Sequence, residues 1–192
     1  MRFPAVAGGR RELPRSGAGT QSKTAREARE ALTSRLRASG FEIDETTVAA
    51  SHALVARRAE FRWEWFASSI HTFVVVLHVP RLNDVVAEEL TDAAQRYAIR
   101  RKGGLPRRMQ TGTATVALLL ADEVESSARS WVTREPHHRF AALRFPVVVG
   151  LETGSLPYFR GRMKRGYIFG EYLRSLLEDV IRPALPRSDL GD

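Results

Sequence analysis

The chain has 192 residues, of which 43% are hydrophobic and 27% are charged, a composition typical of a globular domain with a sizeable core and unlike that of a disordered chain. It contains no cysteine, which excludes disulfides, thiolate zinc sites and thiol nucleophiles. Its longest apolar runs, FVVVL and VALLLA, are far shorter than the roughly 20 residues that cross a bilayer. We therefore expect no membrane partner.

The net charge of +8 is concentrated near the N-terminus. Residues 1–40 carry nine basic and three acidic side chains, whereas the other 152 residues carry 21 and 19. Residues 1–23 combine Gly, Pro, Ser and Arg without a period, which indicates a flexible basic tail, and residues 187–192 are expected to form a C-terminal tail. Pro4, Gly8 and Gly9 interrupt any apolar signal segment, which favours a cytoplasmic protein.

A helix is predicted from Thr24 to Gly40. Thr24 and Glu27 form a capping box, and apolar residues then recur on one face until the glycine ends the helix. Residues 44–58 fit either a helix or a strand, and we favour a strand. Alternation over residues 59–66 and a β-branched run over residues 70–79 predict two further strands, joined most simply as a hairpin.

The second half of the sequence alternates between helical and extended patterns. A helix is predicted from Asp84 to Lys102, with acids at its start and bases at its end, as the helix dipole favours. A strand over residues 113–120 and a short helix opened by Asp122 and Glu125 follow. The remaining predictions are a strand over residues 139–151, in which Pro146 marks a bulge or an edge, and a strongly periodic helix over residues 168–184.

Strands joined by helices indicate βαβ crossovers beside antiparallel hairpins. We therefore predict a single α+β domain over residues 24–186. Its expected architecture is a mixed, mostly antiparallel sheet with about four helices packed on it, preceded by the flexible N-terminal tail.

No nucleotide-binding, serine-hydrolase or zinc-protease motif is present. His71 and His78 are seven residues apart on one predicted strand, so they point to opposite faces and do not chelate one metal ion. The adjacent His137 and His138 diverge in a predicted loop. We therefore predict neither a metal site nor a cofactor.

Two basic loops form the candidate binding site. The first, RRKGGLPRRMQTG over residues 100–112, has its two glycines after a helix and before a strand, which is the reverse of the order in phosphate-binding loops. The dipole and capping account for the basic residues at the helix end but not for those beyond it. The second loop, RGRMKRG over residues 160–166, precedes a helix N-terminus, where positive charge is unfavourable unless an anion compensates it. The predicted ligand-binding residues are Arg101, Lys102, Arg107, Arg108, Gln110, Arg160, Arg162, Lys164 and Arg165.

These features favour a non-enzymatic binding or protein-interaction module that recognises an anionic small molecule or an acidic protein surface, provided that the two loops are neighbours. One alternative is a small enzyme acting on a phosphorylated or carboxylated substrate, with arginines holding the substrate and His71 or His78 as acid or base. Another is nucleic-acid binding through residues 1–40, with a steep salt dependence that disappears when residues 1–23 are removed.

Overall fold

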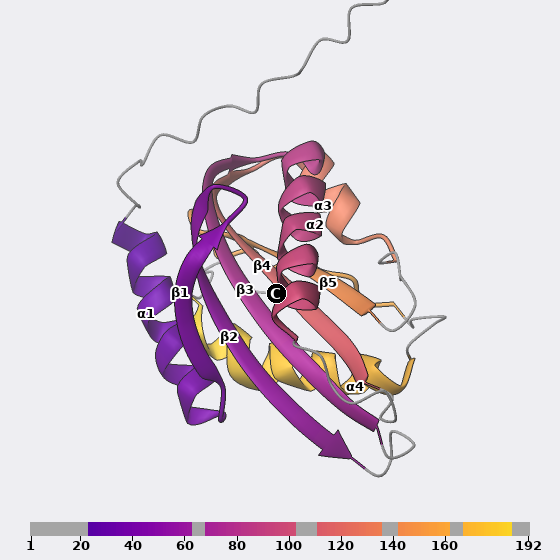
Figure 1. The fold of residues 1–192 in the computed structure, drawn as a ribbon. Coiled ribbons are helices and arrows are strands. Elements are labelled where there is room, and N and C mark those ends of the chain that lie inside the picture. The colour runs from indigo at the N-terminus through magenta and orange to yellow at the C-terminus, as the bar shows by residue number, and fades with distance from the viewer. Residues whose placement is uncertain (1–22, 63–67, 103–110, 136–141, 162–166, 186–192) are drawn as a thin grey trace, which may run out of the picture.

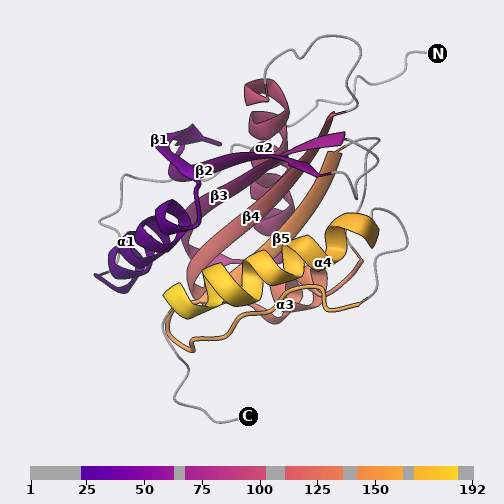
Figure 2. The same ribbon diagram turned by 90° about the horizontal axis from the view of Figure 1, so that it is seen from below.

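The computed structural model describes residues 23–62, 68–102, 111–135, 142–161 and 167–185. It contains a five-stranded sheet between two layers of helices (Figures 1 and 2). Residues 1–22 of the predicted N-terminal tail lie outside the described residues, and Lys23, the last residue assigned to that tail, begins the first helix. The elements, in chain order, are α1 (Lys23–Ala38), β1 (Glu42–Val48), β2 (Ser51–Arg62), β3 (Ser68–Leu82), α2 (Asp84–Arg101), β4 (Thr111–Val124), α3 (Ser126–Val132), β5 (Ala142–Gly150) and α4 (Tyr167–Ser175), which continues through a π-helical turn (Leu176–Ile181) and a 3-10 turn (Arg182–Ala184).

The strands follow one another in the order β1-β2-β3-β4-β5. The β1–β2 and β2–β3 pairs are antiparallel, whereas the β3–β4 and β4–β5 pairs are parallel. The predicted mixed α+β sheet with four packed helices is therefore confirmed. The sheet is not mostly antiparallel, because α2 and α3 carry the chain back across the sheet and leave β4 and β5 parallel to β3.

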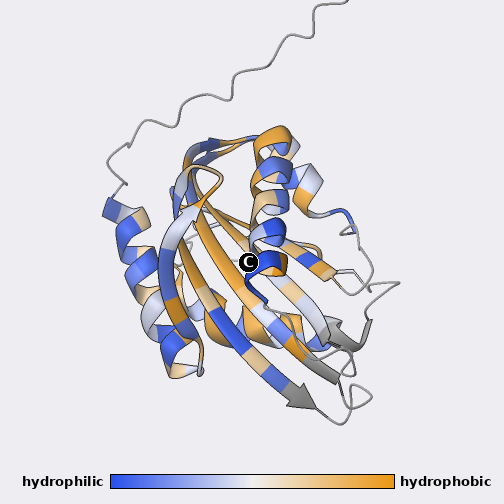
Figure 3. Ribbon diagram, viewed as in Figure 1, coloured by the Kyte–Doolittle hydropathy of each residue, from blue (hydrophilic) through white to orange (hydrophobic). Residues whose placement is uncertain are grey.

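Each face of the sheet has its own hydrophobic core. On one face, α1, α4 and the turns after α4 cover alternate strand residues such as Val74 and Leu118. On the other face, α2 and α3 cover the residues between them, such as Val75 and Leu119. The inner strands are buried on both faces, so they are apolar along most of their length (Figure 3).

The first two strands differ from the prediction. Residues 44–58 are not one strand, because β1 ends at Val48, a two-residue turn follows at Ala49–Ala50, and β2 begins at Ser51. Both alanines have positive φ angles, 53° and 60°. This turn contains none of the glycine or asparagine that marks such turns in sequences, so the sequence pattern did not reveal it.

The other boundaries follow the local signals more closely. The first predicted helix is present as α1, which ends at Ala38, two residues before Gly40; this glycine lies in the turn that follows and has φ +80°. Asn83 caps α2, since its side chain accepts a hydrogen bond of 2.9 Å from the Val86 amide. The short helix begins at Ser126 rather than Asp122, because β4 runs on to Val124. None of the helices in the described ranges is long and apolar enough to cross a membrane.

Candidate functional site

Three of the nine predicted ligand-binding residues, Arg101, Lys102 and Arg160, are described by the structure. Arg101 is exposed and forms an ion pair of 3.4 Å with Asp44. Lys102 caps α2, and its backbone amide donates to the Ala98 carbonyl. The predicted residues Arg107, Arg108, Gln110, Arg162, Lys164 and Arg165 lie outside the described residues.

The described ends of the two basic loops approach the same end of the sheet. Tyr158 is antiparallel to Val147 of β5, so the chain at Arg160 runs toward the start of β5. Lys102 precedes the loop that leads to the start of β4, and β4 and β5 are parallel neighbours. The guanidinium of Arg160 lies over the Tyr158 ring, 5.2 Å from its centroid. Convergence of the two loops on one ligand stays a prediction.

The two candidate acid–base histidines have different surroundings. Burial lowers the pKa of His71, and the positive charges of Lys102 and Arg57 lower it further. His78 lies 3.2 Å from both carboxylate oxygens of Asp122. Within the described residues, no group of three His, Asp or Glu side chains is arranged to hold a metal ion.

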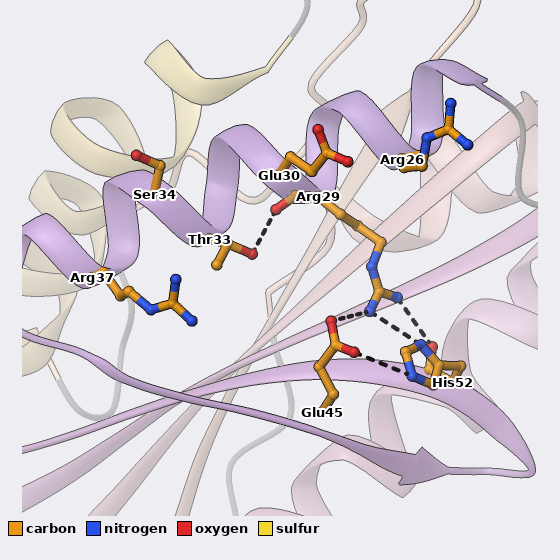
Figure 4. Close-up of a pocket in the computed structure, with 8 residues that line it drawn as sticks. All are labelled: Arg26, Arg29, Glu30, Thr33, Ser34, Arg37, Glu45 and His52. Atoms are coloured by element: carbon orange, nitrogen blue, oxygen red, sulfur yellow. Dashed lines mark hydrogen bonds and ion pairs between the residues drawn. The ribbon is translucent and has the colours of Figure 1, made fainter.

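A site that the sequence did not predict lies between α1 and the β1–β2 hairpin. We call it the α1–β1 groove; its volume is about 560 Å³ (Figure 4). The helical residues that line it recur every three or four positions, so they share one face of α1. The opposite stripe of α1 is buried in the core. The groove is lined by Arg26, Arg29, Glu30, Thr33, Ser34, Arg37, Glu45 and His52.

Arg29 holds the helix and the hairpin together at the floor of the groove. It is 6% exposed, and its guanidinium donates to the His52 carbonyl at 3.3 Å and to Glu45 Oε1 at 3.5 Å. It also lies 3.2 Å from His52 Nδ1, while His52 Nε2 lies 3.5 Å from Glu45 Oε2. Because a guanidinium only donates, Nδ1 must accept, which places the imidazole proton on Nε2, facing the carboxylate. The three side chains thus form a closed network.

Arg26 and Arg37 line the same groove, but neither forms an ion pair with any other residue drawn in Figure 4. They are eleven positions apart on α1, which corresponds to about 16 Å along the helix axis. Three arginines and two glutamates line the groove, so its formal charge is +1 with a neutral His52. With Arg29 and Glu45 paired, an anion entering the groove meets two arginines and one glutamate, Glu30, which leaves a surplus of one positive charge.

The sequence contained part of the signal for this groove. Residues 1–40 stood out as the basic part of the chain, but the arginines of α1 resembled a solvated helix face. Glu45 and His52 lay in the segment whose structure was ambiguous, and only the turn at Ala49–Ala50 brings their strands into register. No protein-family model, curated protein or solved structure matches this chain.

Proposed function

We propose that this protein is a non-enzymatic binding module that recognises an anionic ligand or an acidic partner surface through the α1–β1 groove. One observation supports this above all. Arg26 and Arg37 line the groove and have no carboxylate partner among its lining residues, whereas Arg29 between them is already held by Glu45 and His52.

The groove has the size and chemistry that such a function needs. Its volume of about 560 Å³ lies within the roughly 300–1,000 Å³ of typical ligand sites. Guanidinium groups present paired donors that match the oxygens of carboxylates and phosphates. The Arg29 network fixes the floor of the groove before a ligand arrives, which limits the entropy lost on binding.

The nine ligand-binding residues predicted in and beside the two basic loops remain a second part of this proposal. Burial lowers the pKa of His71, and the positive charges of Lys102 and Arg57 lower it further; these two cations support a positive potential where α2 ends. That potential favours anions, although Arg101 is paired with Asp44. Six of these nine residues lie outside the described residues, so the proposal is centred on the α1–β1 groove.

Arginine-to-glutamine substitutions in α1 test the proposed function. We expect glutarate and inorganic phosphate to shift the amide NMR signals of α1 in the unaltered protein. The R26Q/R37Q double variant should lose these shifts while its melting temperature stays within a few degrees. Arg35 is also exposed on α1 but does not line the groove, so R35Q is the matched control and should bind normally. Equal shifts in all three proteins would refute the groove as an anion site.

A small enzyme is the second candidate, and His71 supports it. A histidine whose pKa is lowered by burial and by nearby cations stays neutral at pH 7 and can act as a base beside an anionic substrate. Turnover of phosphorylated or carboxylated compounds that disappears in H71N would favour the enzyme. Ligand binding without turnover would favour the binding module.

A further inference from the structure

We propose that the α1–β1 groove receives an acidic peptide segment in extended conformation, which adds to the sheet as a new strand beside β1. This inference rests on the proposed function and specifies its ligand. Strand addition uses backbone hydrogen bonds for affinity and alternate side chains for specificity. The edge of β1 and the arginines of α1 offer both.

β1 is the first strand of the sheet and, within the described residues, pairs only with β2. The pair Val48–Ser51 closes a two-residue turn. In such hairpins the closing pair exchanges both backbone hydrogen bonds, and every second pair after it does the same. The residues between these pairs direct their N–H and C=O groups away from β2. On β1 these residues are Ile43, Glu45 and Thr47.

The free edge and the groove lie side by side. α1 runs along β1 (Figure 1), and the two elements are in contact. Glu45 points toward α1, since its carboxylate reaches Arg29. Ile43 and Thr47 alternate in phase with Glu45, so their side chains lie on the same face. A strand added at this edge would therefore place every second side chain over the α1–β1 groove.

The spacing of the two arginines that have no ion pair within the groove fits a strand better than a compact anion. Arg26 and Arg37 are about 16 Å apart along the axis of α1, which is too far for one carboxylate or phosphate to contact both. An extended peptide rises about 3.4 Å per residue. Two acidic side chains four residues apart lie on one face and are separated by about 14 Å, a gap that flexible arginines can bridge.

The acids of β1 do not prevent an acidic peptide from binding, because each has a cation of its own. Glu42 pairs with Arg57, Asp44 with Arg101, and Glu45 with Arg29. The surplus charge at this edge is therefore positive. The incoming peptide would use the two arginines that no β1 carboxylate neutralises.

Other occupants fit this edge less well. A second copy of β1 would bring three more carboxylates to the strand EIDETTV, and like charges across a strand pair are destabilising. Residues 1–22 carry four arginines and one glutamate, so they do not supply two carboxylates. A nucleic-acid backbone would meet the arginines but would leave the amide groups of β1 without the regular pattern of a partner strand.

The test uses the full-length chain and the synthetic peptide Ac-Val-Glu-Val-Thr-Val-Glu-Val-NH2, whose glutamates are four residues apart. Binding should protect the amides of Ile43, Glu45 and Thr47 from hydrogen exchange. The R26Q/R37Q variant should weaken binding, by about 2- to 5-fold per exposed ion pair lost. T47P removes one outward amide without touching the ladder to β2 and should weaken binding by about 2- to 10-fold. Its control T47A keeps the amide and should bind normally.

Two N-methylated peptides isolate the backbone contribution. One carries the methyl group on the central threonine amide and the other on the valine amide that follows it. Adjacent amides point to opposite sides of a strand, so one methylation should abolish binding and the other should not. Equal effects of the two methylations, or equal binding by T47P and T47A, would overturn strand addition. If R26Q/R37Q still weakens binding in that case, the anion site itself is supported.

Self-occupation of the edge has its own signature. If the amides of Ile43, Glu45 and Thr47 are already protected in the free monomer, the chain itself covers the edge. If their protection rises with protein concentration, a second copy covers it. Either result overturns the proposal, whereas fast exchange in the free protein at every concentration supports it.

Discussion

The turn between β1 and β2 stores backbone strain that a double substitution should release. Ala49 and Ala50 have φ angles of 53° and 60°, in the left-handed region where the Cβ atom of an L-residue crowds the backbone. This conformation costs about 1–2 kcal/mol per residue, and glycine escapes the cost. Asn-Gly is the pair that two-residue hairpin turns of this kind prefer. A49N/A50G should therefore stabilise the protein.

The expected gain follows from two opposing effects at Ala50. Glycine relieves about 1–2 kcal/mol of strain but loses about 0.5–1 kcal/mol more backbone entropy on folding than alanine does. Asparagine at position 49 should add a few tenths of a kcal/mol, because it tolerates the left-handed region better than alanine. Together the two changes should raise the free energy of unfolding by about 1 kcal/mol. In a chain of this length that corresponds to a rise of about 2–4 °C in the melting temperature.

Urea unfolding and calorimetry measure this effect, with a matched alanine-to-glycine change as control. Ala31 lies inside α1, where glycine has no strain to relieve and should destabilise the protein by about 1 kcal/mol. If A50G destabilises the protein as A31G does, left-handed strain is not what limits the stability of this turn. Ala49 and Ala50 are exposed and do not line the groove, so ligand binding by A49N/A50G should be unchanged.

Three further substitutions test the electrostatics and capping of the fold. Glu178 accepts a hydrogen bond from Tyr158, which lowers the pKa of the carboxyl below 4.5. E178Q should therefore lower the free energy of unfolding by up to about 1 kcal/mol at pH 7. This difference should shrink as the pH falls through the lowered pKa, and a pH-independent difference would contradict the assignment. K102Q should raise the pKa of His71 in an NMR titration without restoring 6.5, because burial is the larger cause of its lowering. N83A should cost about 1 kcal/mol in urea unfolding by removing the cap of α2, and an unchanged midpoint would show that water replaces the cap.

Local patterns predicted the elements whose signals agree with one another. The β-branched run of β3 predicted a strand, and the acidic start and basic end of α2 predicted its limits to within one residue. The hairpin of β1 and β2 was not predicted, because its turn has the composition of a helix or a strand and obtains its conformation from the pairing around it. Tertiary pairing therefore decided what local propensity left ambiguous.

The α1–β1 groove could not be predicted for a related reason. Its residues come from a helix face that resembles any solvated surface and from two strands whose register depends on the Ala49–Ala50 turn. Sequence reasoning instead chose the loops with the most concentrated positive charge. Local charge density showed where cations are frequent, whereas the structure shows which of the described cations are already neutralised.

That distinction explains how an edge strand rich in acids can favour an acidic ligand. The electric fields of two paired, opposite charges largely cancel at the position of a third charge. Glu42 and Asp44 therefore contribute little once Arg57 and Arg101 pair with them. The field felt by a peptide at the edge then comes from the charges without partners, which in the groove include two arginines of α1 and one glutamate, Glu30. Replacing Glu30 with glutamine should remove the last opposing charge and strengthen binding of the two-glutamate peptide, most clearly at low ionic strength, where exposed charges are least screened. Weaker binding by E30Q would mean that Glu30 holds the arginines in place, and the groove would then owe its selectivity to geometry rather than to surplus charge.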